Sequence, residues 1–154
     1  MDAMNGIKEK IEELRKIFTP HSKDDDRYMR IIELGRSLAT YPVALKIPKL
    51  QVAGCQSILY LSSSFRDGRI YFEAHSDALI SAGLAALLIS IYSGETPEAV
   101  LKTPPTFLTD FGIIGSLTPS RSNGLANIHL RMKRDALNFL VERAKSLDFN
   151  AATL

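Results

Sequence analysis

The sequence of 154 residues contains one cysteine, Cys55, and no tryptophan. A single cysteine excludes an internal disulfide, a cysteine-thiolate zinc cluster and a CxxC redox motif. The most apolar stretch, at 78–92, is interrupted by Ser81, Gly83 and Ser90 and falls short of the ~20 apolar residues that a membrane span needs. The first residues lack the basic and apolar segments of a signal peptide. These absences predict a soluble, cytoplasmic protein whose lone thiol stays reduced.

Neither sign of charge predominates, with 19 lysines and arginines against 17 aspartates and glutamates and a formal net charge of +2. This excess is too small to predict binding to nucleic acid or to an anionic membrane. The length and the apolar content of 45% are typical of one compact domain, which we place at 1–154 with its core at about 7–145. The C-terminal tail that follows can be disordered.

The spacing of apolar residues predicts an α+β fold, in which a small antiparallel sheet of about three strands packs against several helices. A turn signal at 66–68 and alternation around Ile70 and Phe72 indicate a β-hairpin. The helix at about 77–92 is apolar almost all round, so it belongs in the core. The predicted helices lie at 5–18, from 24, at 77–92, from 97, at about 106–111 and from 119, and the predicted strands lie at about 50–52, 56–63 and 69–74.

The lone cysteine lies in a glycine-containing turn, Gly54-Cys55-Gln56-Ser57, between two predicted strands. Gly54 can adopt backbone angles that other residues cannot, so the turn can present the thiol at a loop tip. Reactivity depends on the environment, because a thiol with a pKa near 8.5 is only about a tenth or less thiolate at neutral pH. The alternative is a buried cysteine that packs as a small hydrophobe, which is the usual fate of a free cysteine.

No obvious base lies next to Cys55 in the sequence, but His75, Asp77 and Arg121 could reach it in the folded protein. Arg121 is unusual because it falls in the first turn of the last predicted helix, where the helix dipole disfavours a cation. Its presence indicates an anionic partner, and a plain surface arginine is the equally acceptable alternative.

A metal site is a weaker hypothesis. His21, His75 and His129 could in principle join Cys55 as zinc ligands, but no pair has a short ligand spacing such as H-x3-H. We therefore expect surface or capping histidines and no metal. Motifs for phosphate binding and for Ser-His-Asp catalysis are also absent.

Several short motifs occur in an order that closely resembles SufE, the sulfur-acceptor family of iron–sulfur cluster assembly. The resemblance extends from about residue 7 to about residue 145, and the ordered set is far more specific than any one motif. The motifs are Tyr28-x-x-Ile31-Ile32-Glu33-Leu34-Gly35, Gly54-Cys55-Gln56-Ser57, Ser76-Asp77-Ala78, Gly83-Leu84 and Leu117-Thr118-Pro119-Ser120-Arg121-Ser122-x-Gly124-Leu125.

The resemblance implies a partnership with a pyridoxal-phosphate-dependent cysteine desulfurase similar to SufS. In that family the desulfurase holds sulfur as a persulfide on its own cysteine. The SufE thiolate attacks the outer sulfur and carries it to a scaffold complex similar to SufBCD. The family's acceptor is the cysteine of the Gly-Cys-Gln-Ser turn, which is Cys55 here. The resemblance thus implies a sulfur carrier and desulfurase activator rather than an enzyme, with no cofactor of its own and a fold similar to that of IscU.

The remaining candidate residues take supporting roles under this resemblance. We expect Cys55 to be partly sheltered, because a persulfide is reactive. Members of the family often have a tryptophan shortly after the cysteine motif, and Tyr60 is predicted to take its place. Residues expected to shape the turn are Gly54, Gln56 and Ser57, and residues expected to support the site or face the partner are Asp77, Arg121 and His75.

One cysteine fits a sulfur relay, since exchange at sulfur needs one nucleophile. It does not fit a cluster scaffold, which needs several ligands. The rival hypothesis is a non-catalytic binding module in which Cys55 is structural.

Overall fold

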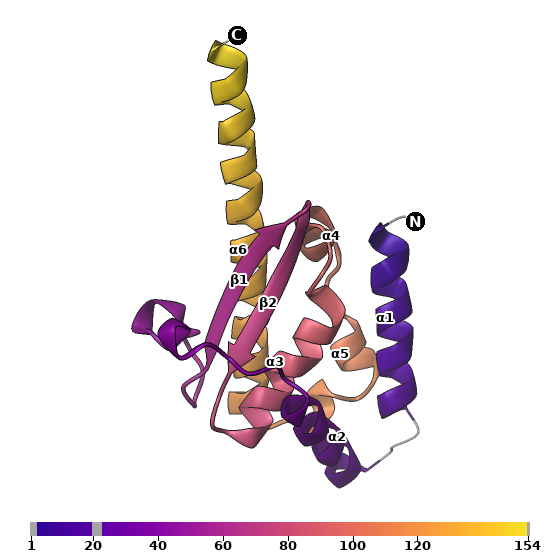
Figure 1. Cartoon of the computed structure of the whole chain (residues 1–154). Coiled ribbons are helices and arrows are strands. Elements are labelled where there is room, and N and C mark those ends of the chain that lie inside the picture. Colours follow the sequence, from indigo (N-terminus) through magenta and orange to yellow (C-terminus); the bar gives the residue numbers. More distant parts are fainter. Residues whose placement is uncertain (1–2, 20–22, 154) are drawn as a thin grey trace.

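The computed structural model describes residues 3–19 and 23–153 (Figure 1). The fold is α+β, as predicted, and combines an antiparallel hairpin with helices. The elements are α1 (Ala3–Phe18), α2 (Asp24–Arg36), the 3₁₀ turns η1 (Val43–Leu45) and η2 (Pro48–Leu50), β1 (Tyr60–Arg66), β2 (Arg69–His75), α3 (Leu79–Tyr92), α4 (Pro97–Lys102), α5 (Phe107–Asp110), the 3₁₀ turn η3 (Ile114–Ser116) and α6 (Pro119–Thr153).

The sheet has two strands in the described part of the chain, one fewer than predicted. β1 and β2 pair antiparallel around a tight turn at Asp67 and Gly68, both of which have positive φ as a type I′ hairpin requires. The third strand predicted near 50–52 is reduced to a single bridge between Gln51 and Tyr60. The reason is local, because η2, with Pro48 as its first residue, occupies the segment immediately before the bridge.

Helix α3 lies at the centre of the molecule, in contact with α1, α2, α6 and β2 (Figure 1). This explains why it is apolar on nearly all sides, and the prediction of a core helix is confirmed. One face of β2 is buried through the alternating residues Ile70, Phe72 and Ala74. The hairpin thus covers one side of α3 while α2 packs on another.

Two glycines allow α2 and α3 to approach closely. A Cβ atom on Gly83 would lie 2.2 Å from the carbonyl oxygen of Ile31, and one on Gly35 would lie 2.7 Å from the amide nitrogen of Gly83. The backbones therefore touch where the helices cross, which larger residues would prevent. Ile32 of α2 and Ile80 of α3 both line a cavity at the surface of the molecule.

Helix α1 is joined to the body by a partly buried ion pair. Lys10 Nζ lies 2.6 Å from Glu95 Oε2 and also donates to the carbonyl of Ser93 at 2.8 Å. Glu95 precedes α4 and is only 3% exposed. The pair connects α1 to the turn after α3, in addition to the apolar contacts of Ile7 and Leu14 with the core.

Helix α6 has an exposed first turn, packs against the core along its next turns and ends outside the core. Leu125, Ile128, Met132 and Ala136 are buried, and Phe139 stacks on Phe65 of β1 with 5.3 Å between ring centroids. The C-terminal turns then project beyond the rest of the fold (Figure 1). Within the part of the chain that the structure describes, no helix has both the length and the apolar character needed to cross a membrane.

Candidate functional site

Cys55 lies on a turn that is fastened at both ends. Gly54 has a φ of +80°, which confirms the prediction that the glycine supplies a backbone conformation that other residues rarely adopt. Before the turn, the amide of Val52 donates to the carbonyl of Leu59 at 2.9 Å and closes its base. After the turn, Ser76 Oγ donates to the carbonyl of Ile58 at 2.8 Å. The chain between these bonds, which includes Cys55, bulges from the body as a short loop.

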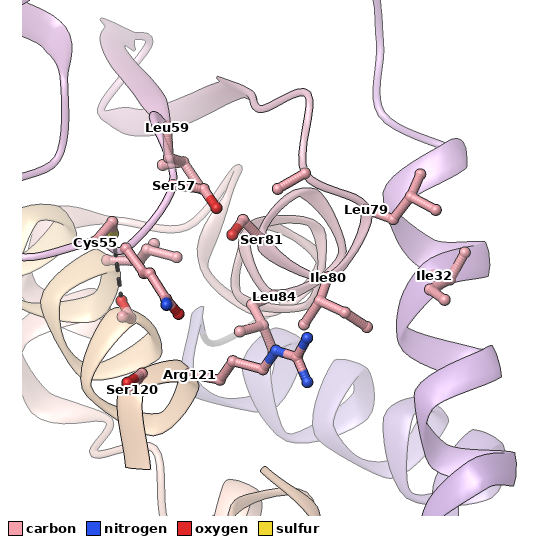
Figure 2. Close-up of a pocket in the computed structure, with 14 residues that line it drawn as sticks. Ile32, Cys55, Ser57, Leu59, Leu79, Ile80, Ser81, Leu84, Ser120 and Arg121 are labelled. Atoms are coloured by element: carbon pink, nitrogen blue, oxygen red, sulfur yellow. Dashed lines mark hydrogen bonds between the residues drawn. The ribbon is translucent and has the colours of Figure 1, made fainter. Parts of the chain in front are cut away.

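The loop forms one wall of a cavity of about 350 Å³ (Figure 2). The opposite walls come from the beginning of α3 and the beginning of α6, and Ile32 of α2 lies at the far side. The lining is mixed, with mainly apolar side chains from α3 and both polar and apolar side chains from the loop and α6. Among the lining residues are Cys55, Gln56, Ser57, Leu84, Arg121 and Ile128.

The Cys55 thiol is half-buried, as expected for a sheltered acceptor. Its Sγ atom lies 3.9 Å from the carbonyl oxygen of Gly124 on α6, a weak contact drawn as a dashed line in Figure 2. Burial raises the pKa of the Cys55 thiol, because removal from water disfavours the charged thiolate. In the free protein the group is therefore held mainly as the neutral thiol at neutral pH.

Of the three titratable residues proposed from the sequence as neighbours of Cys55, only Arg121 lines the same cavity. His75 and Asp77 instead pair with each other, with 3.1 Å between His75 Nε2 and Asp77 Oδ1. They line a neighbouring hollow that shares Ser57 and Ala78 with the cavity. The Asp77 side chain is fully exposed and thus available to another molecule.

The position of Arg121 has a structural explanation that the sequence did not supply. Its backbone amide donates to Thr118 Oγ1 at 3.3 Å, so Thr118 caps the first turn of α6. The guanidinium lies over the ring of Tyr28, with Cζ 5.6 Å from the ring centroid. A cation–π contact of this kind offsets part of the unfavourable helix dipole. Figure 2 shows the side chain extending from α6 towards Ile80 and Leu84 of α3.

Sequence reasoning missed Asn127, which contacts the turn directly. Its Nδ2 atom donates to the carbonyl of Gly54 at 3.2 Å. The two residues are 73 positions apart, so no local pattern could have associated them. Position 127 is one turn along α6 from Gly124, whose carbonyl contacts Cys55, and this spacing was the only available signal.

The zinc hypothesis finds no support in the arrangement of the described residues. In that part of the chain no cluster of three or more His, Cys, Asp or Glu side chains has the geometry of a metal site. The His129 ring packs at a tilt against the ring of Tyr92, with 5.3 Å between centroids, and burial lowers the pKa of His129 to about 4. Neither His75 nor His129 lines the cavity of Cys55, and His21 lies outside the described residues.

Comparison with known proteins places this geometry in a family. The model of the SufE family, described as an Fe-S metabolism associated domain, matches residues 12–136. A SufE-like protein of Synechocystis sp. (strain ATCC 27184 / PCC 6803 / Kazusa) is 35% identical over 79% of this chain and 77% of that protein. The sulfur acceptor protein CsdE of Escherichia coli (strain K12) is 32% identical over 74% of this chain and 79% of its own length.

A solved structure has a similar fold. The solution structure of a hypothetical protein from Thermus thermophilus matches with a TM-score of 0.72 and 25% identity, over 86% of this chain and 96% of that one. The chain belongs to the SufE family, and the resemblance read from its motifs is confirmed.

Proposed function

We propose that the protein is a sulfur acceptor and activator of a cysteine desulfurase, and that Cys55 receives the sulfur. The observation that carries the proposal is the placement of the chain's single thiol, half-sheltered on a glycine turn at the wall of a cavity. Membership of a family named for iron–sulfur metabolism and similarity to a named sulfur acceptor support it. The further delivery to a scaffold complex similar to SufBCD is part of the proposal.

The proposed step is exchange at sulfur. The Cys55 thiol first loses its proton to solvent or to a base of the partner, because the thiolate is the nucleophile. The thiolate attacks the outer sulfur of a persulfide on the desulfurase, a new S–S bond forms on Cys55, and the old S–S bond breaks. The desulfurase cysteine leaves as a thiolate and is ready for another turnover. The sulfur is transferred without an external oxidant or reductant.

The raised pKa of Cys55 has a consequence for this step. In the free protein the thiol is mainly protonated and reacts slowly, which protects it from adventitious electrophiles. Docking of the desulfurase would have to hydrate the thiol or bring positive charge towards it. Arg121 lines the same cavity and is our candidate for supplying that charge. The cavity also leaves room beside Sγ for the transferred sulfur.

The other predicted residues have positions compatible with their proposed roles. Gln56 and Ser57 follow the acceptor in the turn and line its cavity. His75 and Asp77 lie on an adjacent exposed surface, where we place contacts with a SufS-like partner. Pyridoxal phosphate is assigned to that partner, and we expect this chain to need no cofactor of its own.

The test is intact-mass spectrometry after incubation with a SufS-like desulfurase and free cysteine. We expect a gain of about 32 Da, one sulfur atom, which reductant removes. The Cys55→Ser variant should show no gain, and omission of free cysteine should abolish the gain in the wild type. Sulfur acceptance by Cys55→Ser would refute the assignment of the acceptor.

The rival, a binding module with a structural cysteine, makes a different prediction. A free cysteine that serves only for packing is usually buried, whereas Cys55 packs against the edge of the core and is half-buried beside a cavity. Under the rival, alkylation of Cys55 lowers thermal stability and leaves sulfur flow unaffected. Under our proposal, alkylation blocks the mass gain while the melting temperature changes little.

A further inference from the structure

The amide of Asn127 contacts the backbone immediately before the acceptor. Asn127 lies on α6, and its Nδ2 atom donates to the carbonyl oxygen of Gly54 at 3.2 Å. Cys55 is the next residue, so the bond restrains the peptide group that joins Gly54 to the acceptor. Asn127 is partly buried as a residue, whereas the hydrogen bond itself lies at an exposed position.

Gly54 and Asn127 also fit each other sterically. A Cβ atom at position 54 would lie 2.3 Å from Asn127 Nδ2 and 3.0 Å from its Cγ atom. The amide therefore lies directly against the glycine Cα. The positive φ and this close approach are two independent reasons for glycine at position 54.

The contact ties the turn to α6 at the point where the thiol itself is held weakly. Cys55 Sγ approaches the carbonyl of Gly124 at only 3.9 Å, a poor hydrogen bond. The base of the loop is held by the backbone hydrogen bond from Val52 to the carbonyl of Leu59, which does not reach the tip. The Asn127 bond is thus the stronger of the two polar contacts between the tip and α6.

We propose that Asn127 is a positioning residue that holds the Cys55 turn against α6 and so sets the reactivity of the acceptor thiol. A role of Asn127 in sulfur transfer rests on the acceptor role proposed above. The effect of Asn127 on the reactivity of the Cys55 thiol can be measured without any partner. Loss of the bond would let the turn move away from α6 and would hydrate Sγ.

Two features of the surroundings of Cys55, a nearby cation and burial, bear on the direction of the effect. Among the described residues that line the cavity, α6 contributes the cation Arg121, while the loop, α3 and α2 contribute neutral side chains. Burial is the cause that raises the pKa of the thiol, so a more hydrated turn lowers that pKa towards its usual value. A larger thiolate fraction reacts faster with an electrophile at neutral pH.

The test is the rate of Cys55 alkylation by iodoacetamide as a function of pH. We expect Asn127→Ala to react roughly fivefold faster than the wild type at pH 7, the factor by which loss of one net hydrogen bond shifts an equilibrium. The midpoint of the rate–pH profile should move to lower pH. Asn127→Leu keeps the bulk of the side chain without its donor and should behave in the same way.

The matched control is Asn123→Ala, an exposed asparagine one turn earlier on the same helix. It should leave both the rate and the midpoint unchanged. Wild-type rates and midpoints in folded Asn127→Ala and Asn127→Leu would overturn the proposal. Loss of the circular dichroism spectrum in both variants would overturn it too, because Asn127 would then be needed for folding rather than for positioning.

The acceptor role of Cys55 and the positioning role of Asn127 fail separately. Without a 32 Da gain on Cys55 in the presence of desulfurase (about one sulfur atom), the acceptor role is lost while the alkylation result stands. Unchanged alkylation in a protein that does gain sulfur removes only the role of Asn127.

Discussion

The substitution Gly83→Ala tests whether the backbones of α2 and α3 are in close contact where the two helices cross. The new Cβ atom would lie 2.2 Å from the Ile31 carbonyl oxygen and 2.5 Å from Ile31 Cγ2, and Ile31 is fully buried. Relief requires the helices to separate, so we place the cost at the upper end of overpacking, ~3 kcal/mol. The higher helix propensity of alanine offsets ~1 kcal/mol of this cost. The net loss of ~2 kcal/mol should lower the melting temperature of a chain this size by roughly 4–8 °C.

Gly6→Ala is the matched control, because Gly6 also lies within a helix but has room. A Cβ atom there would be 3.5 Å from Glu95 Oε1, an ordinary contact. The propensity gain then stands alone, and the melting temperature should rise by roughly 2–4 °C for ~1 kcal/mol. Thermal unfolding followed by circular dichroism measures both variants. A melting temperature of Gly83→Ala at or above that of the wild type would refute the argument from close backbone contact.

Two further predictions concern buried polar groups. Lys10→Met removes the partner of the buried Glu95 carboxylate, and we expect a loss of ~3 kcal/mol in urea unfolding, at the lower end for a broken buried pair because Lys10 is partly exposed. The double variant with Glu95→Gln should recover part of this loss, and an additive result would contradict the pairing. His129 has a pKa lowered to about 4, below its usual value near 6.5, so the unfolded chain binds the proton first and stability should fall as the pH decreases from about 6.5 to about 4. In His129→Phe this part of the pH dependence should disappear, and an unchanged slope would show that other groups cause it.

The local features of the site were predictable because they depend on neighbouring residues. Gly54 before Cys55 indicated a turn with unusual backbone angles, and the structure has a positive φ there. The turn at 66–68 and the core helix α3 were also predicted from short patterns. The prediction of a third strand was wrong, because η2 begins at Pro48 and leaves only Gln51 to pair with Tyr60.

The neighbours of the thiol could not be predicted in the same way. His75, Asp77 and Arg121 were equal candidates in the sequence, yet only Arg121 lines the cavity of Cys55. His75 is the last residue of β2 and Asp77 follows it, and both line the adjacent hollow. Which of these side chains lies near the thiol depends on how α3 and α6 pack around the loop.

The amino-acid sequence was sufficient to establish the class of fold, the single possible thiol nucleophile and the family to which the ordered motifs belong. These properties reside in composition and in patterns a few residues long, which local sterics and hydrophobic burial translate directly into structure. The folded chain was needed to learn that Cys55 is half-buried, that it shares a cavity with Arg121, and that Asn127 fastens its turn. These contacts join residues far apart in the chain, and they exist because buried helices pack in one arrangement that brings their surfaces together.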